Sequence, residues 1–374
     1  MEMSGKGVLK HFTALQDRRK APIYPLDEIL FLALCAIICG AEEWTAVTLW
    51  GNTHLEWLRR ILPYDKGIPS HDTVGRVFAC LDARTFERCF TEWMQSLCPT
   101  LGTDIAIDGK TLRRSHRRGI GGKAIHMVSA FSSATGVALG QIKTAEKSNE
   151  ITAIPELLKA ICVKDCLVTI DAMGNQKKIA EAIINKGGDY LLSVKENQPT
   201  QYEALKDFFR IAEEEQYANI TYEQCQSIEK DHGRIETRRC VTTNQLDWLE
   251  KKLKWKNMQS IVMIESIREI GKTRSIEQRF YVTSAPANAL RLAKSVRNHW
   301  GIENRLHWCL DVSFNEDQCR VRIGDAAENF SILRRIALNL LRQETSKKVG
   351  IKSRRMLAGW DLDYLAKLLG VLNV

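Results

Sequence analysis

The first hundred residues carry apolar side chains at the three- and four-residue spacing of amphipathic α-helices. An apolar run, ILFLALCAIIC, begins at Ile29 shortly after Asp27 and is too short to cross a bilayer, so it predicts a buried core helix. Further along, Ser70 precedes an apolar face that begins at Val74, which predicts a helix capped by the serine. Residues 1–98 are therefore expected to form a helical N-terminal domain. This domain could hold a DNA-binding helix-turn-helix, or it could only pack on the rest of the chain.

From about residue 101 the pattern changes to short apolar runs divided by turn residues. Strands are predicted over residues 104–108, 123–131 and 136–143. Two more strands, CLVTID and YLLSVK, each follow a helical pattern. The resulting order βββαβαβ is that of a ribonuclease H-like domain, so the predicted fold class is α/β. A catalytic core of this kind would comprise residues 101–199 and 286–374.

Residues 200–285 interrupt this order. The segment EALKDFFRIAEEEQ predicts a helix, and two strands are expected around a turn at Gly271-Lys272. Because the ribonuclease H-like order needs none of these elements, the segment is expected to be an α+β insertion. Behind it, Ala289 to about Leu310 and the segment AAENFSILRRIALNLLRQ predict two further helices.

Two of the predicted strands end in an aspartate. IAID places Asp108 behind one buried strand, and LVTID places Asp171 behind another. If these strands are neighbours that run in the same direction, both carboxylates emerge at one edge of the sheet. Two adjacent carboxylates repel each other unless a cation lies between them, and Mg²⁺ prefers oxygen ligands. Alternatively, each aspartate only caps the turn that follows its strand.

A glutamate interrupts an apolar stripe on the predicted helix near the C-terminal third. The stripe consists of Val296, His299, Glu303, Leu306 and Leu310, which share one face at helical spacing. If this helix packs on the sheet near the two aspartates, Glu303 completes a site of three carboxylates; otherwise it forms a buried salt bridge. Two metal ions about 4 Å apart in such a site can catalyse an in-line phosphoryl displacement.

The chain has a formal net charge of +9 and a pI near 9.0, which favours an anionic partner such as nucleic acid. Positive charge is concentrated in GKTLRRSHRRGIGGK, directly after Asp108, where no acidic residue occurs. This segment suits a phosphate backbone, although it could also be a solvated loop. The candidate DNA contacts are Lys110, Arg113, Arg114, Arg117, Arg118, Lys195, Asn197, His299 and Asn304. Tryptophans on the glutamate helix are equally compatible with packing and with base stacking.

The 11 cysteines include no CxxC pair. We interpret them as buried thiols in a reducing cytoplasm rather than as zinc ligands. The early apolar run follows acidic residues and lacks the character of a secretion signal, so the protein is expected to be cytoplasmic.

Five segments together resemble the DDE transposases of bacterial insertion sequences, above all the H-repeat-associated group. These segments are AIDGKTLRRS, TIDAMGNQKKIA, YLLSVKENQP, DHGRIETR and NHWGIENRLHWCLDVSFNEDQ. The resemblance covers nearly the whole chain. It implies Asp108, Asp171 and Glu303 as catalytic metal ligands, two Mg²⁺ ions for which Mn²⁺ can substitute, and association with the bacterial nucleoid. It also implies double-stranded DNA as partner, both transposon ends and target, and a homodimer on DNA.

One departure from that resemblance concerns the residues around the glutamate. Related enzymes carry tyrosine, arginine and lysine where this chain has Val296, His299 and Leu310. The DNA contacts of that signature are therefore not carried over, and Asp311 and Glu316 stay open as alternative third ligands. The expected activity is hydrolysis at transposon ends followed by strand transfer into target DNA. The alternatives are a metal-dependent nuclease without strand transfer and an inactive, DNA-binding transposase relic.

Overall fold

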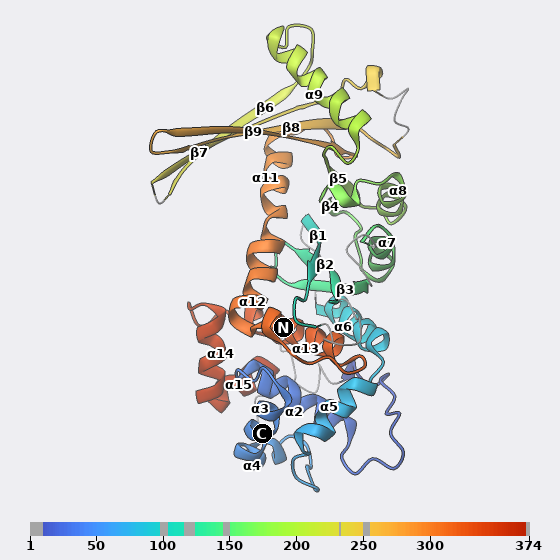
Figure 1. The fold of residues 1–374 in the computed structure, drawn as a ribbon, viewed down its shortest axis with the longest axis vertical. Helices are drawn as coiled ribbons and strands as arrows, with labels where there is room; N and C mark the ends of the chain where they lie inside the picture. Colours follow the sequence, from blue (N-terminus) through green and yellow to red (C-terminus); the bar gives the residue numbers. More distant parts are fainter. Residues whose placement is uncertain are drawn as a thin grey trace.

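A computed structural model describes residues 10–97, 104–115, 124–144, 150–231, 233–249 and 255–371. It shows an elongated molecule in which helices gather at one end and a mixed nine-stranded sheet extends away from them (Figure 1). The helices before the sheet are α2 (Leu26–Ile38), α3 (Trp44–Thr53), α4 (Leu55–Arg59), α5 (His71–Cys80) and α6 (Ala83–Leu97). These helices agree with the helical pattern of the first hundred residues.

Helix α2 is the apolar run expected to lie in the core, and it is buried along most of its length. In the described part of the chain, every helix is too short or too polar to cross a membrane. Helix α5 begins as the sequence predicted, because the Ser70 side chain accepts a hydrogen bond from the backbone N–H of Thr73.

The last helices of the chain return to this helical end (Figure 1). They are α12 (Trp308–Phe314), α13 (Ala326–Gln343), α14 (Ile351–Trp360) and α15 (Leu362–Leu369). Helix α13 packs against α2, α5 and α6 and is buried over nearly all of its length. Asn339 of α13 accepts from Ala138 N at 2.9 Å and donates to Ala138 O at 2.8 Å, which satisfies the backbone of an edge strand. The helical end is thus built from both ends of the chain.

The sheet has the strand order β3-β2-β1-β4-β5-β9-β8-β7-β6. β1 pairs in parallel with β4, and β4 in parallel with β5, whereas the other described pairs are antiparallel. The first five strands are β1 (Asp104–Thr111), β2 (His126–Ser132), β3 (Ala138–Thr144), β4 (Leu167–Ile170) and β5 (Asp189–Val194). The helices between them are α7 (Glu150–Ala160), the short 3₁₀ turn η2 (Ala172–Gly174) and α8 (Lys177–Asn185).

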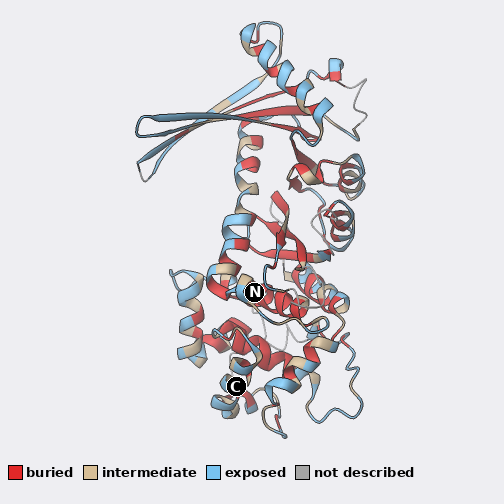
Figure 2. Ribbon diagram, in the orientation of Figure 1, coloured by how far each residue is buried: buried red, intermediate tan, exposed pale blue. Residues whose placement is uncertain are grey.

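The segment after β5 continues this sheet. Helix α9 (Pro199–Glu214) is followed by β6 (Glu223–Asp231), β7 (Arg234–Thr243), β8 (Ser260–Ile270) and β9 (Thr273–Thr283). The turn between β8 and β9 lies at Gly271 and Lys272, where the sequence placed it, but β6 and β7 were not foreseen. Because β9 pairs with β5, the insertion extends the core sheet, and we call these four strands the sheet arm. Figure 2 shows that its projecting end is exposed.

Helix α11 (Ala289–His299) crosses the sheet on the face opposite α9 and packs against β1, β4, β6 and β7. It passes through a π-helical turn, η3 (Ile302–His307), into α12. Among the ten described cysteines, which are all free thiols, Cys80 and Cys162 are exposed. The expectation of buried cysteines is therefore wrong for these two, since Cys80 ends α5 and Cys162 lies in the connection after α7, and three others, Cys39, Cys225 and Cys319, are only partly buried.

Candidate active site

Asp108 and Asp171 follow paired positions of the neighbouring strands β1 and β4, but Asp108 lies within β1, which continues to Thr111, and not behind the strand as the sequence predicted. β1 and β4 pair in parallel with Ile107 opposite Ile170. The residue that follows each of these isoleucines is an aspartate. This pairing meets the condition that the sequence set for a common carboxylate edge. Asp171 is also a cap, since its Oδ1 accepts hydrogen bonds from two backbone N–H groups of the following turn at 3.0 and 3.4 Å. Both bonds use the same oxygen, so capping does not occupy the whole carboxylate.

A cavity of about 240 Å³ is lined by all three carboxylates predicted from the sequence. Asp108 comes from β1, Asp171 follows β4, and Glu303 comes from the π-helical turn. Two cationic side chains complete its wall: Lys195 follows β5, and Arg279 belongs to β9. The cavity therefore combines acidic oxygens with cations that could face a phosphate group.

Glu303 is exposed, so its predicted position on the buried face of a continuous α-helix is wrong. The helix widens to π geometry from Ile302 onward, and Ile302 takes the buried position instead. Turns of this kind inside α-helices are frequent at functional sites. Exposure suits a metal ligand, because the ion and its substrate must reach the carboxylate from solvent.

Burial and neighbouring carboxylates raise the pKa of both aspartates of the cavity. Burial, followed by the charge of Asp171, raises the pKa of Asp108 to about 7, and Glu150 and Glu303 add to this. Burial also raises the pKa of Asp171, with Glu150 as the largest charge effect, whereas Lys195 opposes the shift. Negative charge is therefore crowded here without a full balance of cations from the chain.

The donor chemistry of the cavity fits a hard divalent cation, because Asp108, Asp171 and Glu303 line it, and the fourth carboxylate of the lining, Glu277, is paired with Arg279 at 2.8 Å. The described residues nevertheless contain no group of three or more His, Cys, Asp and Glu side chains placed to hold a metal ion as they stand. The residues that would hold the ion are thus present but not converged.

The alternative third ligands, Asp311 and Glu316, lie in a separate cluster around Lys110. Lys110 Nζ lies 3.1 Å from Glu316 Oε2 and 3.8 Å from Asp317 Oδ1, and it also contacts Asp311. Although burial alone raises it, Arg335 and Lys110 hold the pKa of Glu316 well below its usual range. Because these carboxylates already have cationic partners, the structure favours Glu303 as the third member.

Lys110 is misplaced as a predicted DNA contact. Its side chain is only 8% exposed, and its ammonium group is surrounded by carboxylates. The sequence did not show this, because the three acidic partners follow some two hundred residues later. A phosphate group would have to displace these buried ion pairs, so Lys110 is a structural cation.

Two other predicted contacts lie on the described part of the arginine-rich segment. Arg113 is 82% exposed and lies 3.3 Å from Asp317. Arg114 is exposed, and its carbonyl oxygen accepts a hydrogen bond from Arg322 Nε at 2.7 Å. Arg117 and Arg118 lie outside the described residues. The two arginines of this segment that the structure describes, Arg113 and Arg114, are therefore at the surface, as a contact to phosphate requires.

Lys195 and Asn197 follow β5 and are both exposed. Lys195 lines the carboxylate cavity, as the DNA-contact hypothesis needs. Asn197 donates from Nδ2 to the carbonyl oxygen of Ala172 at 2.8 Å, which ties this loop to the turn that Asp171 begins. Asn197 therefore has a local structural role whether or not it contacts DNA.

His299 and Asn304 lie on either side of the glutamate turn. His299 lines the carboxylate cavity, and its Nδ1 lies 3.0 Å from the Thr169 hydroxyl. Burial lowers the pKa of His299 to about 4, so its imidazole is neutral near pH 7. Asn304 is exposed and lines a neighbouring hollow rather than the cavity itself. Only His299 of this pair is therefore adjacent to the carboxylates.

Sequence reasoning missed a buried pair behind Asp108. Glu150 Oε1, at the start of α7, lies 2.6 Å from His126 Nε2 of β2. Both side chains lie so close to Gly109 that a Cβ there would collide with them. A glutamate at a helix start was the only sequence signal for this pair. Its position beside Asp108 depends on the packing of α7 against the sheet.

His307 was also missed as a neighbour of Asp108. Its Nδ1 lies 3.5 Å from Asp108 Oδ2, and its Nε2 is buried with no hydrogen-bond partner among the described residues. Burial, Arg335 and Lys110 lower the pKa of His307 to about 3, so the ring is neutral. The π turn brings this ring toward β1, which helical spacing alone does not predict.

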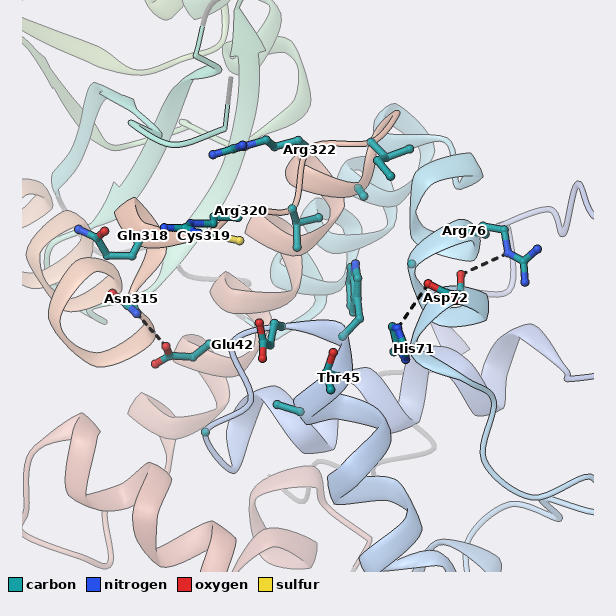
Figure 3. Close-up of a pocket in the computed structure, with 18 residues that line it drawn as sticks. Glu42, Thr45, His71, Asp72, Arg76, Asn315, Gln318, Cys319, Arg320 and Arg322 are labelled. Atoms are coloured by element: carbon teal, nitrogen blue, oxygen red, sulfur yellow. Dashed lines mark hydrogen bonds and ion pairs between the residues drawn. The ribbon is translucent and has the colours of Figure 1, made fainter. Parts of the chain in front are cut away.

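A larger cavity, of about 1100 Å³, lies between α3, α5 and the segment that joins α12 to α13. Figure 3 shows Asp72 and Arg76 on one wall and Arg320 and Arg322 on the other, with Glu42 bonded to Asn315. None of the three predicted catalytic carboxylates lines it, and its charges are mixed. The smaller cavity is therefore the one that brings the three predicted carboxylates together.

Comparison with known families identifies the class of protein that combines this sheet with these carboxylates. Residues 77–340 match the family described as the transposase DDE domain, and residues 9–94 match the family described as DDE_Tnp_1-associated. The chain belongs to the DDE transposase family.

Its relatives include bacterial transposases of the same length. It is 40% identical over 375 residues to the "H repeat-associated putative transposase YhhI" of Escherichia coli strain K12, with 98% of each chain covered. It is 41% identical over 374 residues to the "Putative transposase YncI" of Escherichia coli O157:H7, with 98% of this chain and 95% of that protein covered. A solved structure of a piggyBac transposase synaptic complex with hairpin DNA aligns with a TM-score of 0.44 at 10% identity, covering 96% of this chain and 76% of that one.

Proposed function

We propose that this transposase cuts a DNA phosphodiester at transposon ends and joins the released 3′ hydroxyl to target DNA, using Asp108, Asp171 and Glu303. The observation that carries the proposal is the single cavity lined by these three carboxylates. Membership of the DDE family supports it. The strand order β3-β2-β1-β4-β5, with β1, β4 and β5 parallel, supports a ribonuclease H-like core.

When bound, a pair of Mg²⁺ ions would activate the attacking oxygen and stabilise the leaving oxygen. Asp108, whose pKa is raised by the charges of both Asp171 and Glu303, would hold both ions. Asp171 and Glu303 would each hold one. Lys195, and Arg279 held by Glu277, would bind and orient the phosphate group. The neutral His299 ring narrows the cavity without adding a charge that would repel the metal ions.

The test is cleavage of duplex DNA that carries the sequences flanking the gene, in the presence of Mg²⁺. Asp108→Asn, Asp171→Asn and Glu303→Gln should each abolish cleavage, because each removes a charged metal ligand. Glu196→Gln is the matched control, since Glu196 is exposed on the same loop as Lys195. Normal cutting by Glu303→Gln would contradict the assignment of the third ligand.

The same assay separates strand transfer from simple cutting. Joined products are expected when a second DNA is present, whereas a metal-dependent nuclease would give only cut ends. If the wild-type chain binds DNA but neither cuts nor joins it, the chain is an inactive relic. Base-specific contacts are proposed for the N-terminal helical region, residues 1–98, and a homodimer is proposed for the DNA-bound state.

A further inference from the structure

Helix α11 is fastened to the start of β1 by one buried carboxylate. Asp104, four residues before Asp108 on the same strand, is only 2% exposed. Its Oδ1 accepts hydrogen bonds from Arg291 Nη1 at 2.6 Å and from the Ser295 hydroxyl at 3.1 Å, and its Oδ2 accepts from Asn298 Nδ2 at 2.6 Å. Both oxygens of the carboxylate are therefore bonded to a single helix.

The three donors share one face of α11, because they follow one another at spacings of four and three residues. A shift of the helix by one residue would move each donor by about 1.5 Å along the axis and turn it by roughly 100°. Such a shift would break all three bonds. A buried ion pair contributes little net stability by itself, and fixing the register of packed elements is its best-attested use. Asp104 therefore fixes the register of α11 on β1.

Further bonds hold the helix where it enters the π turn. His299 Nδ1 lies 3.0 Å from the hydroxyl of Thr169 on β4. Directly behind β2, the Ser133 hydroxyl donates to the carbonyl oxygen of Asn298 at 3.0 Å. The Ser133 carbonyl oxygen accepts from Arg305 Nη1 at 2.9 Å. The backbone of the π turn is thus held on both sides.

The register of α11 bears directly on the carboxylate cavity. Asp104 and Asp108 point to the same face of β1, because side chains alternate along a strand. Glu303 follows Asn298 by five residues, so any shift of α11 is passed on to it. A displacement of about 1 Å in a catalytic group can lower a rate by roughly 100-fold.

We infer that Asp104 is a positioning residue, which sets the place of Glu303 relative to Asp108 by fixing the register of α11. Asp104 is not part of the lining of the carboxylate cavity, so it acts through the helix and touches neither metal nor substrate. The inference rests on the proposed function, because it takes Glu303 as the third carboxylate of the site.

The first experiment measures hydrogen exchange of the backbone amides of residues 289–307 in metal-free, full-length protein. Asp104→Asn should speed their exchange about 10- to 100-fold, since hydrogen bonds to a charged group stabilise a locally opening element by that factor. The matched control is Asp189→Asn. Asp189 begins β5 as Asp104 begins β1, but its Oδ1 accepts from the Ser284 hydroxyl at 2.7 Å and not from a helix. Equal exchange of these amides in the two variants would overturn the inference.

The second experiment measures Mn²⁺ binding by the free protein, without DNA. Asp104→Asn should weaken binding about 10- to 100-fold, the range found when a residue that supports a metal ligand is lost. In a Glu303→Gln background, Asp104→Asn should change the affinity by no more than about twofold, because the ligand that it positions is already gone. A loss of the same size in both backgrounds would show that Asp104 acts through general stability and not through Glu303.

A third variant covers misfolding of Asp104→Asn, which thermal unfolding would reveal. Asn298→Ala removes one donor and leaves the pair of Asp104 with Arg291 in place. It should speed the same amides and weaken Mn²⁺ binding to a smaller extent. Wild-type exchange and affinity in a folded Asn298→Ala protein would contradict the inference.

The failure of the proposed site and the failure of this inference give different results. If Glu303→Gln binds Mn²⁺ as tightly as wild type, the third ligand is wrong, while faster exchange in Asp104→Asn alone would still support its role in the register of α11. If Glu303→Gln weakens Mn²⁺ binding and Asp104→Asn does not, the proposed site stands and the positioning role is wrong.

Discussion

Two groups of carboxylates start from neighbouring positions of β1 and have opposite electrostatics. In the carboxylate cavity, burial and the nearby acidic groups raise the pKa of Asp108 to about 7. Two residues further on, Lys110 enters a cluster in which Arg335 and Lys110 keep the pKa of Glu316 well below its usual range, against the effect of burial. In the first group, burial and like charges outweigh the nearby cations, whereas in the second the cations outweigh burial.

The balance of charge around the carboxylates distinguishes a structural acidic cluster from a candidate metal site. Glu316 is fully buried with an arginine and a lysine, so its charge holds β1 against the helical end of the molecule. Asp108 and Glu303 face a cavity, and a charge must arrive from outside to balance them. Both groups contain several acidic residues, so the number of carboxylates alone does not distinguish the structural cluster from the candidate metal site.

The largest expected effect comes from breaking the balanced cluster. Lys110→Met removes the cation, so that Glu316 and Asp311 each lose an ion-pair partner. Loss of one partner from a buried ion pair costs roughly 3–5 kcal/mol, so the free energy of unfolding in urea should fall by about that amount. A loss below about 1 kcal/mol would show that the cluster is solvated and that its balance does not stabilise the fold.

The opposite result is expected when a carboxylate of the unbalanced cavity is neutralised. Because the pKa of Asp108 is higher in the folded protein than in the unfolded chain, the wild type loses stability as the pH rises from about 4 through about 7. Asp108→Asn does not have this loss, so in EDTA it should be more stable than wild type by roughly 1–3 kcal/mol at pH 8.

The measurement is urea unfolding of both proteins at several pH values, compared as a difference so that other titrating groups cancel. The advantage of Asp108→Asn should shrink toward zero near pH 4. A constant difference across the pH range would mean that the asparagine acts through packing instead of charge.

The sequence predicted the parts of the fold that depend on local pattern. The buried helix α2 and the Ser70 cap follow from apolar spacing and a capping residue, whereas the parallel pairing of the strands that carry Asp108 and Asp171 was a condition that the sequence left open. Strands β6 and β7 were missed because β6 is almost wholly exposed and shows no apolar alternation. Their existence depends on pairing with β8, a tertiary effect that a single segment does not encode.

Only the residue types of the candidate site and their positions relative to the strands could be predicted from the sequence. The matching segments IAID and LVTID gave a clear signal, although only Asp171 directly follows its strand and Asp108 lies within β1, and the helical spacing brought Glu303 into consideration. The π turn that exposes Glu303 has no signal in that spacing. Lys110 was misassigned because its partners, Asp311 and Glu316, approach only after the chain returns through α12.

A smaller effect should follow from supplying the missing positive charge. Mg²⁺ or Mn²⁺ at about ten times its dissociation constant stabilises a folded site by about 1.4 kcal/mol, provided that the unfolded chain does not bind it. For a protein of this size that corresponds to a rise in Tm of a few degrees. Wild type should show the rise and Asp108→Asn should not, while an equal rise in both would place the ion elsewhere.

The smallest expected effect concerns Arg113, which shares the carboxylate of Asp317 with Lys110. Arg113 is 82% exposed and lies 3.3 Å from Asp317 Oδ2, whereas the buried Lys110 lies 3.8 Å from the other oxygen. Exposed ion pairs contribute about 0.2–1 kcal/mol and are screened by salt, so Arg113→Ala should change the free energy of unfolding by no more than that. The measurement is urea unfolding at low and high salt beside Lys110→Met, whose much larger loss should persist at high salt. A loss for Arg113→Ala as large as that for Lys110→Met would show that burial does not separate these two cations.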